Sequence, residues 1–149
     1  MKAEYINPFL IATKEVIQRM ANIDMALVNT EVKNDLVVSK NIAILVGVTG
    51  DLEGNTIFHL DKNFAKKIAS NMMGGMELDE YDGITESAIC ELSNIIMGNA
   101  STLFSQNQIF INISPPTILT GESINMSLKY KPLLSVKFAK DDNQLEVDI

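Results

Sequence analysis

The 149-residue sequence contains one cysteine, one histidine and no tryptophan. Because Cys90 is the only cysteine, no intrachain disulfide bond can form. With His59 as the only histidine, the chain lacks a Cys/His cluster, so we expect no metal site. His59 lies in an expected strand with no serine or cysteine nucleophile pattern around it, and we interpret it as a structural or surface histidine.

Basic residues are also scarce, because 12 lysines and arginines stand against 19 aspartates and glutamates. The net charge of −7 argues against a nucleic-acid binder, which needs a basic face, and against binding to an anionic membrane surface. No apolar run approaches the roughly 18 residues that a membrane-spanning helix requires. The N-terminus has no basic segment followed by an apolar segment and a cleavage site. We therefore expect a cytoplasmic protein that binds neither nucleic acid nor membrane.

The first half of the chain predicts a helix, three strands and a second helix. Asn7-Pro8 is expected to begin the first helix, because Asn is a good N-cap and Pro is tolerated at the first helical position. That helix is expected to end near Asn22. Strands are expected over 27–38, 42–49 and 56–60, with a turn over 39–41. Asp61 is expected to cap the second helix and Gly74-Gly75 to end it.

The second half predicts a long helix followed by short strands. The helix is expected from about Thr85, its cap, to Ser105, and Pro115-Pro116 forces an edge or a bend among the strands. The strands are expected over 109–113, 124–130, 133–139 and 145–149. Length and composition indicate one domain over 1–149, in which a helix and three strands occur twice, over roughly 5–60 and 84–140.

The long helix carries an unusual row of polar residues at spacings of four, three and four: Ser87, Glu91, Asn94 and Gly98. On an α-helix these positions fall within roughly 60° of arc. Gly98 either leaves space for a partner to approach or serves helix packing. A neighbouring and mostly apolar stripe is expected to face the core; it consists of Ile84, Ala88, Leu92, Ile95, Asn99 and Leu103.

The row resembles the signature of the CheC/CheX family of chemotaxis phosphatases, in which a Ser or Asp, a Glu and an Asn precede an Ile-rich continuation with a Gly. Here the pattern reads Ser87-x-x-x-Glu91-x-x-Asn94-Ile95-Ile96-Met97-Gly98, and the segment Ala3–Phe9 also resembles the start of family members. A single copy of the motif is more similar to CheX than to CheC. The resemblance implies an α/β fold, a pseudo-symmetric sandwich with two long helices packed on a mostly antiparallel sheet.

The resemblance also implies an activity, the hydrolysis of the aspartyl phosphate of a CheY-like receiver in two-component signalling. Asn94 would orient the attacking water, Glu91 would contact a lysine of the receiver, and Ser87 and Gly98 would contact the partner. Mg²⁺ would be held by the receiver, and this chain would bind no cofactor. A homodimer joined through sheet edges is implied as well, and Leu133–Ala139 or Leu145–Ile149 is a candidate edge.

Two other functions stay open: a non-catalytic module that binds a receiver or resembles a flagellar switch protein, and a dimerised structural domain with a degenerate site.

In the first helix, Glu15 and Gln18 imitate the motif with Ile11 in the Ser position, and we interpret them as a dead or coincidental counterpart. Glu86 is expected on a solvated face. Cys90 is expected to be half-exposed, with no base nearby to activate its thiol.

Overall fold

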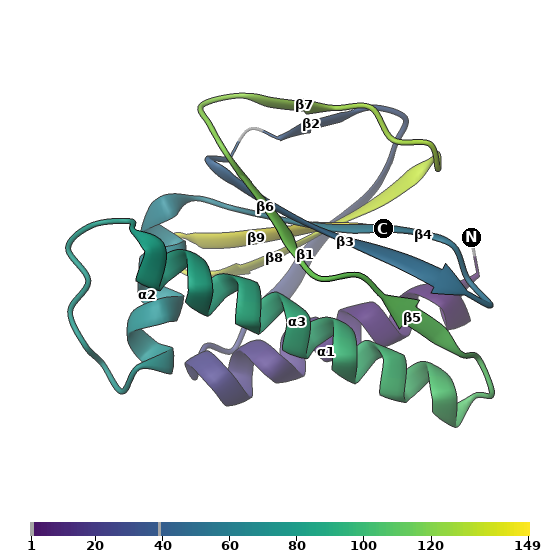
Figure 1. Ribbon diagram of the computed structural model, residues 1–149, viewed down its shortest axis with the longest axis horizontal. Coiled ribbons are helices and arrows are strands. Elements are labelled where there is room, and N and C mark those ends of the chain that lie inside the picture. Colours follow the sequence, from purple (N-terminus) through teal and green to yellow (C-terminus); the bar gives the residue numbers. More distant parts are fainter. Residues whose placement is uncertain (1, 39) are drawn as a thin grey trace.

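The computed structural model describes residues 2–38 and 40–149, which form a β-sheet with helices on one face and a two-stranded ribbon over the other (Figure 1). Ser39, part of the expected turn over 39–41, lies outside the described residues. The elements are α1 (Ala3–Ala21), β1 (Ala26–Lys33), β2 (Leu36–Val38), β3 (Ile42–Gly50), β4 (Gly54–Leu60), α2 (Lys62–Met72), α3 (Gly83–Gln106), β5 (Ile111–Ile113), β6 (Thr117–Thr120), β7 (Ile124–Met126), β8 (Leu133–Lys140) and β9 (Asn143–Asp148). None of the described helices is long and apolar enough to cross a membrane.

The main sheet contains seven strands, and all their pairings are antiparallel. Its order is β1-β8-β9-β4-β3-β5, with β6 also pairing with β3, while β2 and β7 form the separate ribbon. The order places the β3–β4 hairpin of the first half beside the β8–β9 hairpin of the second half. The expected fold class is therefore confirmed.

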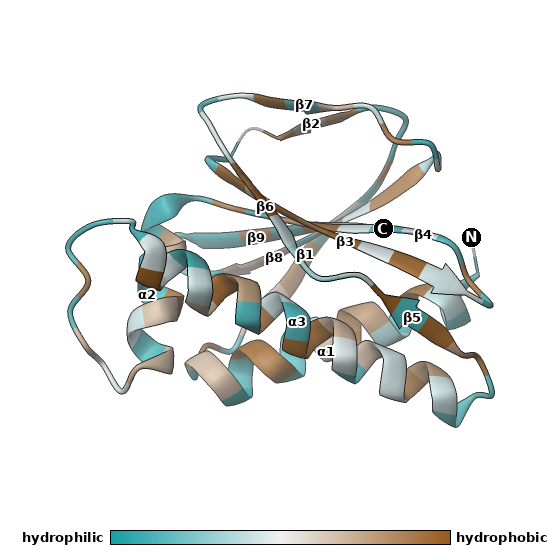
Figure 2. Ribbon diagram, viewed as in Figure 1, coloured by the Kyte–Doolittle hydropathy of each residue, from teal (hydrophilic) through white to brown (hydrophobic). Residues whose placement is uncertain are grey.

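The core lies between the helices and the sheet. The rings of Phe9 on α1 and Phe104 on α3 meet edge to face with centroids 5.1 Å apart, and β3 contributes an almost continuously buried strand. Figure 2 shows hydrophobic residues in β3 and in bands along the two long helices. A smaller apolar cluster lies under the β2–β7 ribbon and includes Leu36, Ile57 and Leu133. The ribbon therefore covers part of the sheet face that carries no helix.

The predicted start of the first helix is wrong. α1 begins at Ala3, and Pro8 lies inside the helix as a buried residue. A proline there removes one backbone hydrogen bond, and the burial of Ile6, Pro8 and Phe9 against the core compensates for that loss. The predicted end is confirmed, because Asn22 adopts the left-handed conformation with φ of 53°.

Three other local predictions are also corrected. The strand expected over 27–38 is two strands, because the chain turns at Asn34-Asp35 between β1 and β2. α3 begins at Gly83 under an Asp82 cap, while Thr85 is buried within its first turn. The segments Leu133–Ala139 and Leu145–Ile149 are not sheet edges, because β8 pairs with β1 and β9, and β9 pairs with β4 and β8. The edge on that side of the sheet is β1.

Candidate functional site

The polar row of α3 is exposed to solvent. Asp82 fixes the start of the helix, since its carboxylate accepts hydrogen bonds from the backbone N–H groups of Ile84 at 3.0 Å and Thr85 at 3.2 Å. Ser87, Glu91 and Asn94 are all exposed. The structure thus brings the three predicted polar side chains together on one accessible face.

The core-facing stripe of α3 is not the one that the sequence predicts. Ile84 is 52% exposed, and Ala88, Ile95, Asn99 and Leu103 are only half-buried. The buried face contains Thr85, Ile89, Leu92, Ser93, Ile96, Met97, Ala100 and Phe104. It lies opposite the polar row rather than beside it, by the helical periodicity. Apolar residues flank the polar row on both sides, so periodicity alone did not decide which side of the helix meets the sheet and α1.

Ser87, Glu91 and Asn94 line one wall of an open groove of about 550 Å³, together with Cys90. The opposite wall is the segment Ile113–Pro116, which connects β5 to β6. Sequence reasoning interpreted Pro115-Pro116 only as a bend and missed this wall. The signal available was the stiffness of two successive prolines, but nothing in the sequence placed them opposite the row.

Hydrogen bonds to β3 hold the second wall in place. The Gly47 N–H donates to Ser114 Oγ at 2.7 Å, and the Ser114 N–H donates to the Gly47 carbonyl at 2.9 Å. A Cβ at Gly47 would lie 3.3 Å from Ser114 Oγ, so this close approach favours glycine. The groove therefore has one helical wall and one wall pinned to the sheet.

Glu91 and Asn94 are free to bind a partner. Other polar side chains of α3 bond back to the helix, as Ser93 Oγ does to the Ile89 carbonyl at 2.8 Å. Within the described residues, the side chains of Glu91 and Asn94 make no hydrogen bond or ion pair. A carboxylate and a carboxamide one helical turn apart thus point into an open groove.

The remaining positions of the row are also placed. No atom outside the helix backbone lies within 4 Å of a Cβ built at Gly98, so the packing explanation for this glycine is wrong. Cys90 is half-buried, as expected, and burial, followed by the charge of Glu86, raises the pKa of its thiol. A raised pKa leaves little thiolate at neutral pH, which argues against a nucleophilic role. Glu86 is half-buried rather than fully solvated.

The imitation of the motif on α1 lies on the surface. Ile11 is 45% exposed, and Glu15 and Gln18 are exposed as well. α1 and α3 run side by side under the sheet (Figure 1). The residues that line the groove come from α3 and the segment Ile113–Pro116, so none of these three α1 positions contributes to it. Whether the α1 positions are inactive stays a prediction.

The model of a protein family described as chemotaxis phosphatase CheX matches residues 42–139, which is more than half of the chain. The chain belongs to the CheX family. It is 26% identical over 152 residues to the CheY-P phosphatase CheX of Thermotoga maritima, a match that covers 100% of this chain and 97% of the relative.

Solved structures share the fold. A CheC-like superfamily protein from Shewanella sp. PV-4 superposes with a TM-score of 0.90 at 21% identity, over 99% of this chain and 97% of the other. A CheX–CheY–BeF3–Mg²⁺ complex from Borrelia burgdorferi contains a chain that superposes with a TM-score of 0.82 at 28% identity, over 97% of this chain and 95% of the other. The similarity thus extends over essentially the whole chain.

Proposed function

We propose that this CheX-family chain is a phosphatase that hydrolyses the aspartyl phosphate of a phosphorylated CheY-like receiver and so ends a chemotaxis or two-component signal. The observation that carries the proposal is the pair Glu91 and Asn94, exposed and unbonded on one wall of the α3 groove. The relative from Thermotoga maritima, named a CheY-P phosphatase, supports it. We expect the protein to act in the cytoplasm, where it meets its receiver.

Asn94 has the chemistry needed to position the attacking water. An acyl phosphate is already activated, so its hydrolysis chiefly requires a water molecule in line with the bond that breaks. The water oxygen attacks phosphorus, the bond from phosphorus to the aspartate oxygen breaks, and the aspartate leaves as a carboxylate. A carboxamide accepts a hydrogen bond from the water and donates to a phosphoryl oxygen without adding negative charge. Mg²⁺ on the receiver would neutralise the phosphoryl oxygens.

Glu91 would fix the position of the receiver. A carboxylate one turn before Asn94 accepts a charge-assisted hydrogen bond from a lysine of the partner, which sets the register of docking. Ser87 and Gly98 lie at the two ends of the row and would contact the receiver surface. The pinned segment Ser114–Pro116 would form the other side of the docking groove.

The decisive experiment measures the decay of a radiolabelled phospho-receiver with and without Asn94→Ala. Losing the water-positioning group should reduce stimulated dephosphorylation at least about 100-fold. Thermal stability should be unchanged within about 0.5 kcal/mol, since Asn94 is exposed. Asn63→Ala on α2 is the matched control, because Asn63 is also exposed but lies outside the groove. Full activity in Asn94→Ala would refute the proposed role, and binding without faster decay in the wild type would favour a non-catalytic module.

We also propose a homodimer through the β1 edge. β1 is exposed along almost its whole length, with Leu27 at 50%, Val28 at 56% and Val32 at 68% exposure. An apolar edge strand is a template for pairing with another strand, and a two-fold axis would pair β1 with the same strand of a second copy. Val28→Lys should convert the dimer to a monomer in light scattering, whereas Leu119→Lys on the opposite edge should not. A wild-type monomer at high concentration would contradict the dimer.

A further inference from the structure

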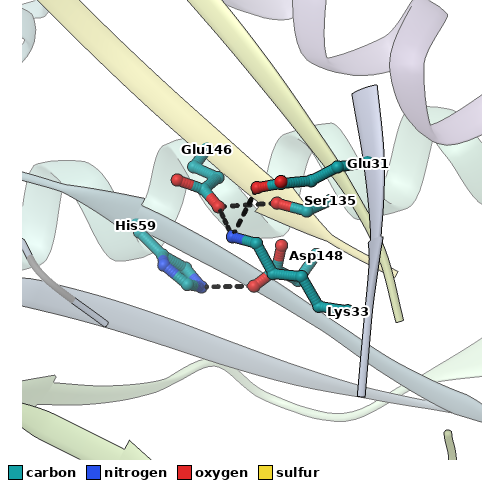
Figure 3. Close-up of polar contacts among 6 residues, drawn as sticks. All are labelled: Glu31, Lys33, His59, Ser135, Glu146 and Asp148. Carbon is teal, nitrogen blue, oxygen red and sulfur yellow. Dashed lines mark hydrogen bonds and ion pairs between the residues drawn. The ribbon is translucent and has the colours of Figure 1, made fainter. Parts of the chain in front are cut away.

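Six polar and charged side chains gather on the sheet face that carries no helix (Figure 3). They come from four adjacent strands and lie far from the α3 groove in the fold, on the other side of the sheet. The group, here called the sheet cluster, consists of Glu31 and Lys33 on β1, Ser135 on β8, Glu146 and Asp148 on β9, and His59 on β4. Cross-strand pairing explains the assembly, because His59 lies opposite Glu146, and Ser135 opposite both Glu31 and Asp148.

The innermost members of the sheet cluster are buried without hydrogen bonds. The Asp148 side chain is 0% exposed and that of His59 is 2% exposed. Neither carboxylate oxygen of Asp148 has a hydrogen-bond partner among the described residues, and neither has His59 Nε2. Nε2 lies 3.0 Å from Asp148 Oδ2, an ion-pair distance for a protonated imidazole (dashed line in Figure 3), but the two atoms do not meet in hydrogen-bond geometry. Buried polar atoms left in this state indicate a bound water or ion.

The charges of the sheet cluster are also unbalanced. Lys33 bonds to Glu146 and lies 3.3 Å from Glu31, while Asp148 lies 3.0 Å from His59 Nε2. Glu146 accepts hydrogen bonds from Lys33 and Ser135, whereas the carboxylate of Asp148 accepts none within the described residues. The cluster therefore holds three carboxylates, one ammonium and one imidazole. Uncompensated charge is costly at a buried site.

We propose that His59, Glu146 and Asp148 bind a divalent first-row metal ion, with zinc as the best match. One ligand atom from each residue lies within 4.8 Å of the other two. Zinc binds imidazole nitrogen and carboxylate oxygen at about 2.0–2.2 Å, which places two ligands of one tetrahedral ion about 3.3 Å apart. The separation of 3.0 Å between Nε2 and Oδ2 is close to that value. A dication would also add positive charge beside three carboxylates that share one ammonium.

Two side chains donate to the ligand Glu146. Ser135 donates to Glu146 Oε1, which would fix the orientation of this carboxylate as outer-shell partners do at metal sites. The ammonium of Lys33 donates to the same oxygen and would compete with the metal for its charge. Lys137 also faces Glu146 across the strands but makes no ion pair within the described residues. The metal would tie β4 to β9 at the centre of the sheet. It would stabilise the fold without taking part in hydrolysis at the α3 groove.

The test uses the full chain and zinc chloride as the probe. Because His59 is the only histidine in the sequence, its imidazole NMR signals report on this site alone. They should shift on addition of zinc and saturate at one equivalent. Co²⁺ should give the visible absorption of a tetrahedral site. At about a hundredfold excess of zinc over its dissociation constant, the melting temperature should rise by about 5–10 °C relative to protein in EDTA.

Variants make the outcome decisive. His59→Gln and Asp148→Asn should each abolish the zinc-dependent shift in melting temperature, while Asp142→Asn in the exposed β8–β9 turn should keep it. Lys33→Met should bind zinc more tightly, because the competing ammonium is gone. The proposal is wrong if the wild-type His59 signals respond to pH but not to zinc, if zinc stabilises His59→Gln as much as the wild type, or if only Lys33→Met binds zinc.

Discussion

The α3 groove and the sheet cluster both contain carboxylates beside other polar side chains, but those of the groove are exposed to solvent and the innermost ones of the cluster are buried. Glu91 and Asn94 are exposed, and water satisfies their hydrogen bonds until a partner arrives. Asp148 and His59 are buried, so their partners must come from the chain or from a bound ion. The exposed pair costs the fold little and is available for docking. The buried group costs free energy wherever a charge is left unmatched.

An unbonded polar side chain therefore has a different meaning on each side of the sheet. At the groove, the absence of intramolecular bonds among the described residues is what a docking surface needs. On the opposite face of the sheet, the same absence among the described residues points to a bound ligand. Substitutions at the two places should therefore separate function from stability.

The largest expected effect is on stability, from Lys33→Met. Lys33 is the ammonium bonded to Glu146, and its removal leaves a partly buried carboxylate without its partner. We expect the free energy of unfolding in EDTA to fall by about 3 kcal/mol, with part of the loss restored by zinc. Urea denaturation measures the change. Lys137→Met on the same face of β8 is the control and should cost much less, and an equal loss in both variants would contradict the special position of Lys33.

The next effect is on function, from Glu91→Gln. The substitution keeps the shape of the side chain and removes the charge that would bind a receiver lysine. A charge-assisted hydrogen bond contributes about 1.5–3 kcal/mol, so KM for the phospho-receiver should rise roughly 10- to 100-fold while kcat changes less. Steady-state hydrolysis measures both constants. Glu86→Gln on the same helix lies outside the groove and should leave KM unchanged; a loss confined to kcat in Glu91→Gln would reassign the residue to chemistry.

Much of this arrangement follows from the sequence, because helical spacing alone places Ser87, Glu91 and Asn94 on one face. The end of α1 at Asn22 and the cap at Asp61 follow from local backbone chemistry, and both are confirmed. The start of α1 does not, since tertiary burial of Ile6 and Pro8 outweighs the local preference of proline. The sequence also did not predict which face of α3 is buried, because apolar residues lie on both sides of its polar row.

Long-range pairing accounts for what the sequence left out. Ser114 lies 67 residues from Gly47, and Lys33 lies 113 residues from Glu146, so no local pattern connects either pair. The sequence did not predict the sheet cluster, because the zinc-site patterns considered contain Cys and His but no carboxylates. The sequence did not predict the wall at Pro115-Pro116, because its position depends on the pairing of β5 and β6 with β3.

The smallest effect is expected from Ser114→Ala, which tests that wall. The variant loses the hydroxyl that accepts the Gly47 N–H, a net cost of about 1 kcal/mol at this exposed position. If the pinned segment shapes the docking groove, KM for the phospho-receiver should rise a few-fold in hydrolysis assays while the sheet stays folded. Thr117→Ala, just beyond the groove on β6, is the control. If KM in Ser114→Ala is unchanged while stability falls as expected, the receiver contacts α3 alone. The polar row of α3 would then carry the function without the Ser114–Pro116 wall.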